Sequence, residues 1–540
     1  MAEPLLEVRD LSVTFQTVRG PVHAVQNISW QVNRGEVLAI LGESGSGKSV
    51  SASAVMDLID CPPGEITSGE IFYEGRDLLK MSHSARRAIN GKKIAMIFQD
   101  PLSHLNPVYT VGWQIEETMV IHGISSKEAK AETLSLLAKV GIPDPEIAAK
   151  KYPHQFSGGQ RQRLMIAMAL ALKPDVLIAD EPTTALDVTV QAQILELLEE
   201  LQKETGMALL IITHDLGVVA EIAHRVVVMN RGVIVEQGTA REIYANPQHE
   251  YTKRLIACAP GQGDIHEQPL DTEPLLQVRD ARKLYGAFEA LSGVSFDLRE
   301  GETLAIVGES GSGKSTTARI LLRLEEASGG TAFYRGQDLF SLSPQEMFKL
   351  RRDIQMVFQD PTQSLNPRMT VYELISEAWA IHREILPKSR WKERVNELLE
   401  EVGLSPEHAH RYPHQFSGGQ RQRIAIARAL ALEPRVIVCD EAVSALDVQV
   451  QGQVIALLDR LKAEFGLSYI FIAHDLPVVR DFADRVIVMK GGRIVEQGPV
   501  RQIFDAPQEP YTQNLLAASL DPDPEIQARR RAERLAEETV

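Results

Sequence analysis

The chain repeats itself, and this duplication limits its fold more than any other feature of the 540-residue sequence. LGESGSGKS occurs at 41–49 and VGESGSGKS at 307–315, while YPHQFSGGQRQR occurs at 152–163 and again at 412–423. The period is far longer than the roughly 20–50 residues of a solenoid repeat. Because a single hydrophobic core stops growing near about 250–300 residues, the repeat predicts two whole domains.

The spacing of the repeated motifs locates an insertion. Gln99 and Gln359 in the two FQDP motifs are 260 residues apart, whereas Gly42 and Gly308 are 266 residues apart. The first copy therefore has six additional residues between these motifs. We place them near Cys61-Pro62-Pro63-Gly64, a stretch rich in turn residues.

Changes in composition mark the domain boundaries. We expect a first domain at 1–258, a linker at 259–274, a second domain at 275–520 and a charged tail at 521–540. The linker contains Pro and Gly, has four acidic residues and no Lys or Arg, and lacks apolar periodicity. The tail is interpreted as a solvated helix or a frayed end, with docking to a partner as the alternative.

Composition excludes several classes of protein. The chain is 44% hydrophobic and 24% charged, which is typical of soluble globular domains. Its 57 basic and 73 acidic residues give a net charge of −16, which argues against nucleic acid as the main partner. The three cysteines form no CxxC pair, so neither a disulfide framework nor a zinc site is expected. We see no signal peptide and no membrane-spanning run, and expect a cytoplasmic protein.

Three apolar runs in each half are typical of buried parallel strands. They lie at 36–42, 176–180 and 209–214 in the first half and at 302–308, 436–440 and 469–474 in the second. Because these strands alternate with helical patterns, each half is predicted to be an α/β domain with a mostly parallel sheet. Polar groups at the carboxyl ends of such strands converge on one crevice.

A glycine-rich loop follows the first of these strands in each half. Gly42–Ser49 and Gly308–Ser315 both match GxxxxGK[ST], in which backbone N–H groups surround a polyphosphate, the lysine neutralises its charge and the hydroxyl binds Mg²⁺. The alternative is a flexible Gly/Ser turn, which two matches in corresponding places make unattractive. The phosphate-binding residues are Gly42, Ser44, Gly45, Gly47, Lys48 and Ser49, and Gly308, Ser310, Gly311, Gly313, Lys314, Ser315 and Thr316.

Paired carboxylates end the second strand of each half. Asp180 and Asp440 are placed to bind Mg²⁺ together with Ser49 and Ser315, and Glu181 and Glu441 to polarise a water for attack on the γ-phosphate. In isolation, such a pair is as often a helix cap. The glycine loops upstream favour catalysis.

Histidine and glutamine complete the set. His214 and His474 end the third strand of each half and are interpreted as γ-phosphate contacts, although a lone histidine is usually structural. Gln99 and Gln359 carry amides that can hydrogen-bond both a water and the metal's ligand shell. By spacing alone, this glutamine signal is weak.

A fifth motif opens an apolar helix in each half. Ser157-Gly158-Gly159-Gln160 and Ser417-Gly418-Gly419-Gln420 combine a good N-cap with two glycines. They also offer backbone N–H groups and the positive end of a helix dipole to an anion. From one copy alone, capping would be the preferred explanation.

The five motifs, in this order and twice, resemble the nucleotide-binding domains of ABC ATPases. The resemblance implies two P-loop NTPase domains, each with an antiparallel β subdomain and a helical subdomain, that pair head to tail around two molecules of ATP with Mg²⁺. It implies that each serine–glycine motif closes over the glycine loop of the other half. Site one then joins Lys48, Ser49, Gln99, Asp180, Glu181 and His214 with Ser417 and Gly419, and site two joins Lys314, Ser315, Gln359, Asp440, Glu441 and His474 with Ser157 and Gly159.

The same resemblance assigns four further residues. Asp187 and Asp447, in ALDV, match the loop that crosses between the halves. Phe15 and Tyr285 match the aromatic that stacks on adenine, although either could instead belong to a core. Copy two reads DEAVSALD where copy one reads DEPTTALD, and its carboxylates remain, so both sites are expected to be active.

A finer resemblance is to the oligopeptide/dipeptide permease ATPases, including fused peptide-importer ATPases of the microcin C type. FQDPLSHLNP, FQDPTQSLNP, and the related segments NPQHEYTKRLIACAP at 246–260 and APQEPYTQNLLAASL at 506–520 carry it. It implies a peripheral subunit on the cytoplasmic face of the inner membrane, with two integral-membrane permease subunits and an extracytoplasmic solute-binding protein as partners. Segments 101–125 and 361–385 would receive permease helices. Only Cys258 lies where some relatives hold an iron–sulfur cluster, so no cluster is expected.

The rival interpretation is a double ABC ATPase that acts on ribosomes or nucleic acid. Translation factors of this layout carry a long basic linker, whereas this linker is short and acidic, and the zinc cysteines of the repair type are absent. Sugar importers are not favoured by the LNP and EYT signatures. The cargo stays open among oligopeptide, dipeptide, microcin-like peptide, glutathione, opine and nickel.

Overall fold

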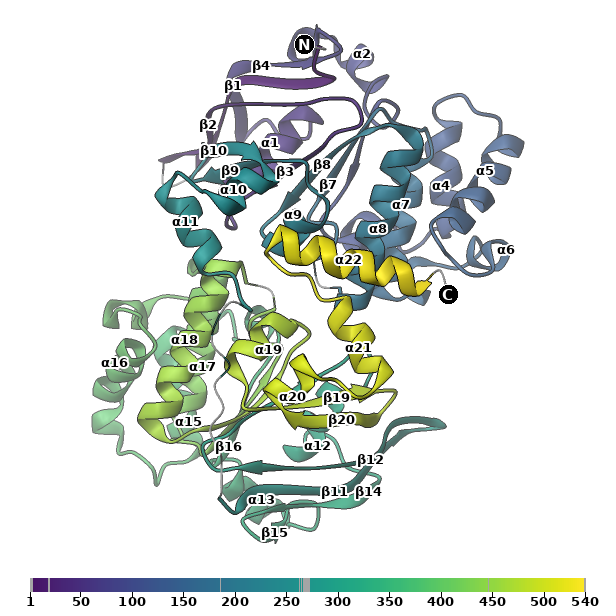
Figure 1. Cartoon of the computed structure of the whole chain (residues 1–540). Coiled ribbons are helices and arrows are strands. Elements are labelled where there is room, and N and C mark those ends of the chain that lie inside the picture. Colours follow the sequence, from purple (N-terminus) through teal and green to yellow (C-terminus); the bar gives the residue numbers. More distant parts are fainter. Residues whose placement is uncertain are drawn as a thin grey trace. The chain divides into compact units, whose positions relative to one another are not determined.

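The computed structural model describes residues 3–17, 20–184, 186–261, 263, 265, 272–444 and 446–538 (Figure 1). It divides into two compact units, one formed by Met1–Ala259 with Leu520–Val540 and the other by Pro260–Ser519. The expected linker at 259–274 falls partly outside the described residues. We call these parts unit 1 and unit 2 and describe each separately.

Unit 1 contains two sheets. A six-stranded sheet has the order β10-β9-β3-β8-β7-β6, in which only β10 runs antiparallel to its neighbour, and a four-stranded antiparallel sheet has the order β2-β1-β4-β5. The strands are β1 Leu6–Thr17, β2 Gly20–Val32, β3 Val37–Leu41, β4 Gly64–Tyr73, β5 Arg76–Asp77, β6 Ile94–Ile97, β7 Val176–Asp180, β8 Ala208–Thr213, β9 Arg225–Asn230 and β10 Val233–Thr239.

Helices surround these sheets, and α4, α5 and α7 pack on one another as a separate helical layer (Figure 1). The helices of unit 1 are α1 Lys48–Val55, α2 His83–Arg87, α3 Pro101–His104, α4 Val111–Val120, α5 Ser126–Lys139, α6 Pro145–Ala148, α7 Gly158–Leu170, α8 Val188–Thr205, α9 Leu216–Ile222, α10 Ala240–Ala245, α11 Glu250–Ala257 and α22 Pro524–Glu538, with short 3₁₀ helices at η1 Leu78–Lys80 and η2 Pro153–Gln155.

Unit 2 repeats this architecture. Its sheets have the orders β16-β17-β18-β13-β19-β20, with only β20 antiparallel, and β12-β11-β14-β15. The strands are β11 Pro274–Tyr285, β12 Phe288–Arg299, β13 Thr303–Val307, β14 Gly329–Tyr334, β15 Gln337–Asp338, β16 Ile354–Val357, β17 Val436–Asp440, β18 Ser468–Ile472, β19 Arg485–Lys490 and β20 Arg493–Pro499.

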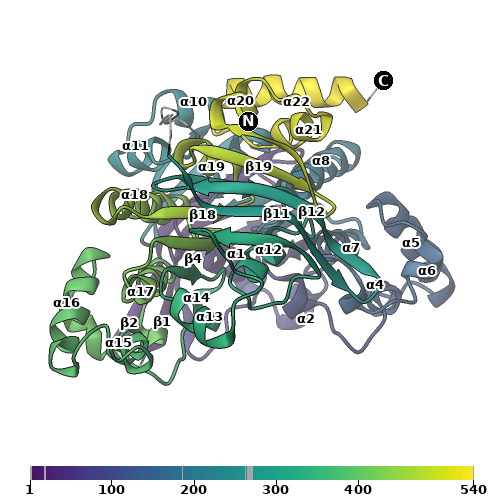
Figure 2. The same ribbon diagram turned by 90° about the horizontal axis from the view of Figure 1, so that it is seen from below.

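The helical layer of unit 2 is formed by α15, α16 and α17, which lie side by side in both ribbon views (Figures 1 and 2). The helices are α12 Lys314–Leu321, α13 Pro344–Leu350, α14 Pro361–Ser364, α15 Val371–Ile381, α16 Trp391–Glu401, α17 Gly418–Leu430, α18 Val448–Phe465, α19 Leu476–Phe482, α20 Val500–Asp505 and α21 Pro510–Ala517, with 3₁₀ helices η3 Lys388–Arg390, η4 Pro406–His410 and η5 Pro413–Gln415.

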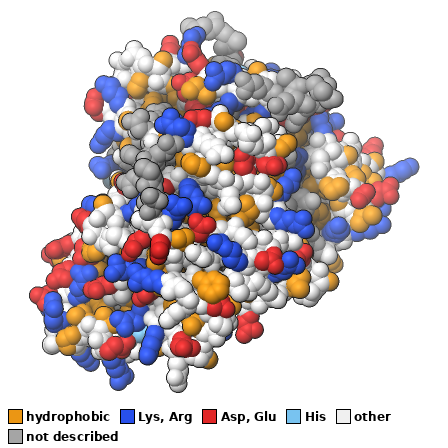
Figure 3. All heavy atoms as spheres, turned by 60° about the horizontal axis from the view of Figure 1, so that its bottom comes forward, with side chains coloured by type: hydrophobic (Ala, Val, Ile, Leu, Met, Phe, Trp, Pro, Cys, Tyr) orange, Lys and Arg blue, Asp and Glu red, His pale blue; other side chains and the backbone are white. Residues whose placement is uncertain are grey.

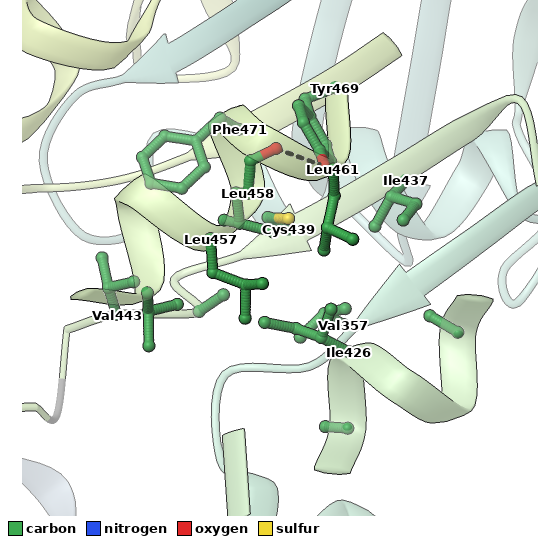
Figure 4. Packing of buried hydrophobic residues seen from close by; sticks show 14 of the residues in the cluster. Val357, Ile426, Ile437, Cys439, Val443, Leu457, Leu458, Leu461, Tyr469 and Phe471 are labelled. Carbon is green, nitrogen blue, oxygen red and sulfur yellow. Dashed lines mark hydrogen bonds between the residues drawn. The ribbon is translucent and has the colours of Figure 1, made fainter. Parts of the chain in front are cut away.

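The sequence-based prediction of an α/β fold with buried parallel strands is confirmed in both units. Every residue of β3, β7 and β8, and of β13, β17 and β18, is buried. In unit 2, α18 packs on this sheet, where the Tyr469 hydroxyl donates to the Leu458 carbonyl at 2.9 Å beside Phe471 and Cys439 (Figure 4). The sheet core is the rigid base on which the loops at the strand ends are held.

The additional residues of the first copy lie where the spacing placed them. Tyr73 and Tyr334 occupy equivalent register positions opposite Leu6 and Leu276, and differ by 261 rather than 266. Most of the additional length therefore lies between the glycine loop and the end of β4, which is 10 residues long against 6 for β14.

The end of the chain packs on unit 1. Leu520 lies in a core cluster with Val218 and Ile222, and α22 contacts α9. Glu221 of α9 is buried there, and it accepts from Arg534 at 2.6 Å and from the Gln527 amide. This differs from the solvated or frayed tail that the charge pattern suggests, because the basic residues of α22 neutralise a carboxylate that lies far away in the sequence.

Surface properties agree with a globular chain of mixed charge. On the face seen in Figure 3, Lys and Arg side chains are interspersed with Asp and Glu. Within the described residues, no helix is both long enough and apolar enough to cross a bilayer. Cys61 and Cys258 are exposed, Cys439 is buried, and all three are free.

Candidate functional site

The glycine-rich loop of unit 1 connects the buried strand β3 to α1. Gly42 and Gly47 have no room for a side chain, because an added Cβ would lie 2.3 Å from the Met229 carbonyl oxygen and 2.4 Å from that of Ala24. Gly45, by contrast, has open space and a φ of +78°, a conformation that glycine adopts without strain. The two ends of the loop therefore pack against neighbouring backbone, whereas its middle is open.

The loop of unit 2 has the same design. An added Cβ at Gly308 would lie 2.2 Å from the Met489 carbonyl oxygen, and one at Gly313 would lie 2.7 Å from Leu291. Gly311 has a φ of +78° and open space around it. Both sequence-predicted phosphate loops thus adopt a backbone that only glycine permits.

The loop lysines are buried and point back at their own loops. Lys48 Nζ donates to the carbonyls of Gly42 at 2.7 Å and Glu43 at 2.8 Å. Lys314 Nζ makes the equivalent bonds to Gly308 at 2.8 Å and Glu309 at 2.9 Å. A positive charge is thereby held within each loop.

Each loop also contains a buried hydroxyl that lacks a hydrogen-bond partner among the described residues, at Ser46 in unit 1 and Ser312 in unit 2. Buried polar groups in proteins are nearly always satisfied. An open loop of N–H groups, a buried ammonium and an unsatisfied hydroxyl suit a bound polyphosphate oxygen. The residues present therefore fit the phosphate chain of a nucleotide.

A hydroxyl and a carboxylate meet beside each loop. Ser49 Oγ donates to Asp180 at 2.9 Å, and Ser315 Oγ donates to Asp440 at 2.9 Å. Burial raises the pKa of Asp180 to about 6, although the Ser49 hydrogen bond favours the carboxylate, and burial also raises the pKa of Asp440. A buried carboxyl whose negative charge is disfavoured without a nearby positive charge, placed beside a hydroxyl oxygen, suits a divalent cation such as Mg²⁺.

Glu181 is the centre of a hydrogen-bonded group in unit 1. It accepts from Gln99 Nε2 at 2.7 Å and from Thr184 Oγ1 at 2.9 Å, and His214 Nδ1 lies 3.1 Å from it. Burial opposes charge on both partners, but their mutual hydrogen bond and attraction lower the pKa of Glu181 and raise that of His214. The carboxylate is therefore kept ionised and fixed, as a general base requires.

Unit 2 contains the same hydrogen-bonded group, but its histidine lies farther from the glutamate. Gln359 Nε2 donates to Glu441 at 2.7 Å, and His474 Nδ1 lies 3.5 Å from that carboxylate. Ser444, at the position of Thr184, donates instead to the Glu441 backbone carbonyl at 2.9 Å. As in unit 1, burial opposes charge on both residues, but their hydrogen bond and mutual attraction outweigh it. The pKa of Glu441 is therefore lowered and that of His474 is raised.

Both glutamates have a backbone conformation that the sequence does not reveal. Glu181 and Glu441 have φ of +47° and +48°, in the left-handed region that side chains other than glycine seldom enter. Their N–H groups donate to Ile212 at 2.8 Å and Ile472 at 3.0 Å on the neighbouring strand. Strain of this kind persists at functional sites, where it aims a side chain. Thr184 was also missed, although it lies in the quoted DEPTTALD motif.

The serine–glycine motifs begin α7 and α17 as predicted. Ser157 and Ser417 each cap their helix through a capping box with Gln160 or Gln420. Gly159 packs so closely on α8 that an added Cβ would lie 2.4 Å from Val190. The joining of these motifs to the glycine loops of the opposite half concerns both units and stays a prediction.

The remaining predicted residues have defined local contacts. Asp187 and Asp447 are N-caps of α8 and α18. Tyr285 is exposed and donates to Glu325, with Lys283 Nζ 4.9 Å from its ring centre, whereas Phe15 is half-buried against the apolar core of unit 1. Crossing between halves by the aspartates and adenine stacking by the aromatics stay predictions.

Two protein families match this chain. Residues 25–184 and 291–444 match the ABC transporter family. The chain belongs to that family. Residues 235–278 and 495–539 match a second family, described as the C-terminal region of oligopeptide/dipeptide transporters. As an ABC transporter ATPase, the chain contains both family segments twice.

Relatives of this ABC ATPase extend over nearly its whole length. The glutathione import ATP-binding protein GsiA of Shigella boydii serotype 4 (strain Sb227) is 49% identical over 556 residues, covering 95% of this chain and 89% of the relative. The peptidoglycan transport ATP-binding protein YejF of Agrobacterium fabrum is 48% identical over 532 residues, covering 96% and 97%. A solved dimeric ATP-binding cassette with ADP and Pi is 33% identical, covering 42% of this chain and 99% of that chain with a TM-score of 0.39.

Proposed function

We propose that this ABC ATPase is the energy-coupling subunit of an importer for peptides or peptide-like solutes. The observation that carries the proposal is the presence of two full sets of hydrolytic groups, one per unit, in a chain whose relatives are named for import of glutathione and transport of peptidoglycan. Glutathione is itself a tripeptide, and peptidoglycan contains short peptides. A small peptide-containing cargo is the chemistry these names share.

The residues of each unit divide the hydrolytic reaction among them. Lys48 and the loop N–H groups bind the β- and γ-phosphates, and Ser49 with Asp180 would hold Mg²⁺, which neutralises phosphate charge when bound. Glu181 orients the attacking water and accepts its proton, while His214 contacts the γ-phosphate. Lys314, Ser315, Asp440, Glu441 and His474 take the same roles in unit 2.

In this proposal two ATP molecules lie between the halves. Ser417 and Gly419 complete the site of Lys48, and Ser157 and Gly159 complete the site of Lys314. Binding of ATP then favours closure and hydrolysis favours opening, a population shift driven by differential affinity. The closure is passed to two permease subunits, with the chain on the cytoplasmic face of the membrane and a solute-binding protein on the other side.

An apolar surface in unit 1 supports the permease contact. Leu102, Val108, Tyr109, Trp113 and Ile121 are exposed in and around α3 and α4, which follow Gln99 directly. Such a patch is typical of a protein-binding surface. Because Gln99 bonds to Glu181, the same short segment connects the patch to the hydrolytic centre.

The corresponding region of unit 2 is hollow. A cavity of about 750 Å³ runs from Asp440 and Gln359 to Ile381 on α15. On α15 the cavity is lined by Leu374, Ala378 and Ile381 together with Glu377, and it continues to the catalytic glutamine. These features suit an inserted permease helix. We therefore assign segments 101–125 and 361–385 to the permease interface.

Removal of both general bases tests this function. The Glu181→Gln, Glu441→Gln double variant keeps the hydrogen-bonding shape but loses the base, so it should bind ATP, hydrolyse it at least about 100-fold more slowly and accumulate in a closed form. Hydrolysis at the wild-type rate would exclude these residues as bases. In a deletion strain, uptake of labelled di-, tri- and oligopeptides that the wild-type gene restores and the double variant does not would support import, whereas co-purification with ribosomes would favour the rival class.

A further inference from the structure

Two tyrosines outside the five motifs reach the phosphate loops. Tyr251 lies on α11 and Tyr511 on α21; each is followed by Thr, and each lies within a match to the second family. Neither helix carries any of the hydrolytic groups described above. The contacts of the two tyrosine hydroxyls indicate a role for these helices.

In unit 1 the tyrosine is buried and its hydroxyl meets the loop backbone. Tyr251 is 3% exposed and packs in a core cluster with Ile243 and Leu255. Its hydroxyl accepts from the Glu43 N–H at 3.3 Å. The carbonyl of the same Glu43 accepts from Lys48 Nζ at 2.8 Å. One residue of the loop is thus held by α11 on one side and holds the catalytic lysine on the other.

Unit 2 contains the same series of contacts. The Tyr511 hydroxyl accepts from the Glu309 N–H at 3.2 Å, and Lys314 Nζ donates to the Glu309 carbonyl at 2.9 Å. The helices EYTKRLIA and PYTQNLLA share Tyr, Thr, Leu and Ala at corresponding positions and differ at the other four. The same contact with the loop therefore recurs in both units.

A neighbouring tyrosine shows that a hydroxyl in this cluster is not required for packing. Tyr244 of α10 borders the cluster of Tyr251 and donates to the Leu216 carbonyl at 2.5 Å, away from the loop. The equivalent position in unit 2, 260 residues later, is Phe504. Between the two halves, the hydroxyl is kept where it touches the phosphate loop and lost where it does not.

We propose that Tyr251 and Tyr511 are positioning residues for nucleotide binding, which fix the second residue of each phosphate loop and through it the lysine. The proposal rests on the proposed ATP sites. Without the hydroxyl, the Glu43 N–H loses this hydrogen bond, and the peptide group whose Gly42 carbonyl accepts from Lys48 is held less firmly. A loop arranged before binding loses less freedom when phosphate enters, so its affinity is higher.

The test replaces each tyrosine by phenylalanine in the full-length chain and measures binding and hydrolysis of MgATP. Tyr251→Phe and Tyr511→Phe should each weaken one of two classes of ATP and ADP binding sites by about 3- to 10-fold, the range that loss of one hydrogen bond gives. The double variant should weaken both classes. In hydrolysis KM should rise by that factor while kcat changes less than about twofold, because the groups around Glu181 and Glu441 are untouched.

Tyr244→Phe is the matched control. It removes a hydroxyl from the edge of the same cluster without touching the loop, so its KM should stay at the wild-type value whatever its thermal stability. A rise in KM equal to that of Tyr251→Phe would show a packing effect and overturn the proposal.

Two further outcomes separate this proposal from the proposed function. If wild-type chain binds ATP, loses it in Lys48→Ala with Lys314→Ala, and both phenylalanine variants bind like wild type, the positioning role is wrong and the ATP sites stand. If wild-type chain binds no ATP, both are wrong. Since Tyr511→Phe tests an independent copy, poor folding of one variant leaves the other decisive.

Discussion

Replacing Asp180 by asparagine is expected to stabilise the nucleotide-free protein while abolishing its Mg²⁺-dependent ATP hydrolysis. Asp180 is 6% exposed, and burial raises its pKa from 3.8 to about 6. Because one pKa unit corresponds to about 1.4 kcal/mol, burying this charge costs about 3 kcal/mol at pH 8. Asparagine has the same shape and still accepts from Ser49, but it carries no charge.

The sign of the pH dependence follows from the direction of the shift. The folded protein holds the Asp180 proton more tightly than the unfolded chain, so this group favours folding most below pH 4. That contribution is lost as the pH rises from 4 to 6. The wild-type and Asp180→Asn proteins should therefore be equally stable near pH 4 and differ by about 3 kcal/mol at pH 8.

Asp175, just before the other end of β7, supplies a control of opposite sign. Burial opposes its charge, but Lys93, Tyr73 and Arg34 together lower its pKa to about 2. Its contribution is present above pH 4 and lost as the pH falls toward 2. Because its partners are partly exposed, Asp175→Asn should lose at most about 2 kcal/mol at pH 8.

The measurement is urea unfolding with EDTA at pH 4 and pH 8, with hydrogen exchange of β7 peptides reporting on unit 1. Hydrolysis of MgATP is assayed in parallel, and Asp440→Asn provides the corresponding test in unit 2, where the pKa is also raised. Equal stability of wild type and Asp180→Asn at pH 8 would refute the argument from burial. An increase in stability at pH 8 in Asp175→Asn would also refute it.

Three further predictions concern packing and coupling. Gly159→Ala places a Cβ 2.4 Å from Val190 and should destabilise unit 1 by about 1–3 kcal/mol. Gly158→Ala, whose Cβ lies 3.8 Å from its nearest neighbour, should be tolerated. Thermal unfolding of both variants distinguishes crowding from the loss of glycine itself. A chain ending at Ser519 lacks Leu520 and α22 and should lower the melting temperature of unit 1 but not that of unit 2, which calorimetry resolves; equal shifts in both would contradict the assignment of α22 to unit 1. Trp113→Glu places a charge on the exposed apolar patch and should abolish uptake while basal ATP hydrolysis persists; parallel loss of both activities would disprove the interface.

The sequence predicts those parts of the fold and site that depend on local chemistry. The buried strands, the glycine loops and the Ser157 cap all follow from short motifs whose physics is self-contained. The left-handed backbone of Glu181 does not follow, because it is imposed by the hydrogen bond to Ile212 on another strand. The contact of Tyr251 with the phosphate loop spans 208 residues and is equally invisible to spacing.

Helix α22 has a consequence for the order in which the protein is made. Unit 2 is one unbroken stretch, Pro260–Ser519, but unit 1 receives its last element only after those residues have been translated. At about 5–20 residues per second, that interval is roughly 15–50 s. Until Leu520 and α22 have been made, the site that Leu520 fills is open to water, and Glu221 lacks the arginine that neutralises it. A chain that terminates before Leu520 therefore exposes apolar side chains on unit 1.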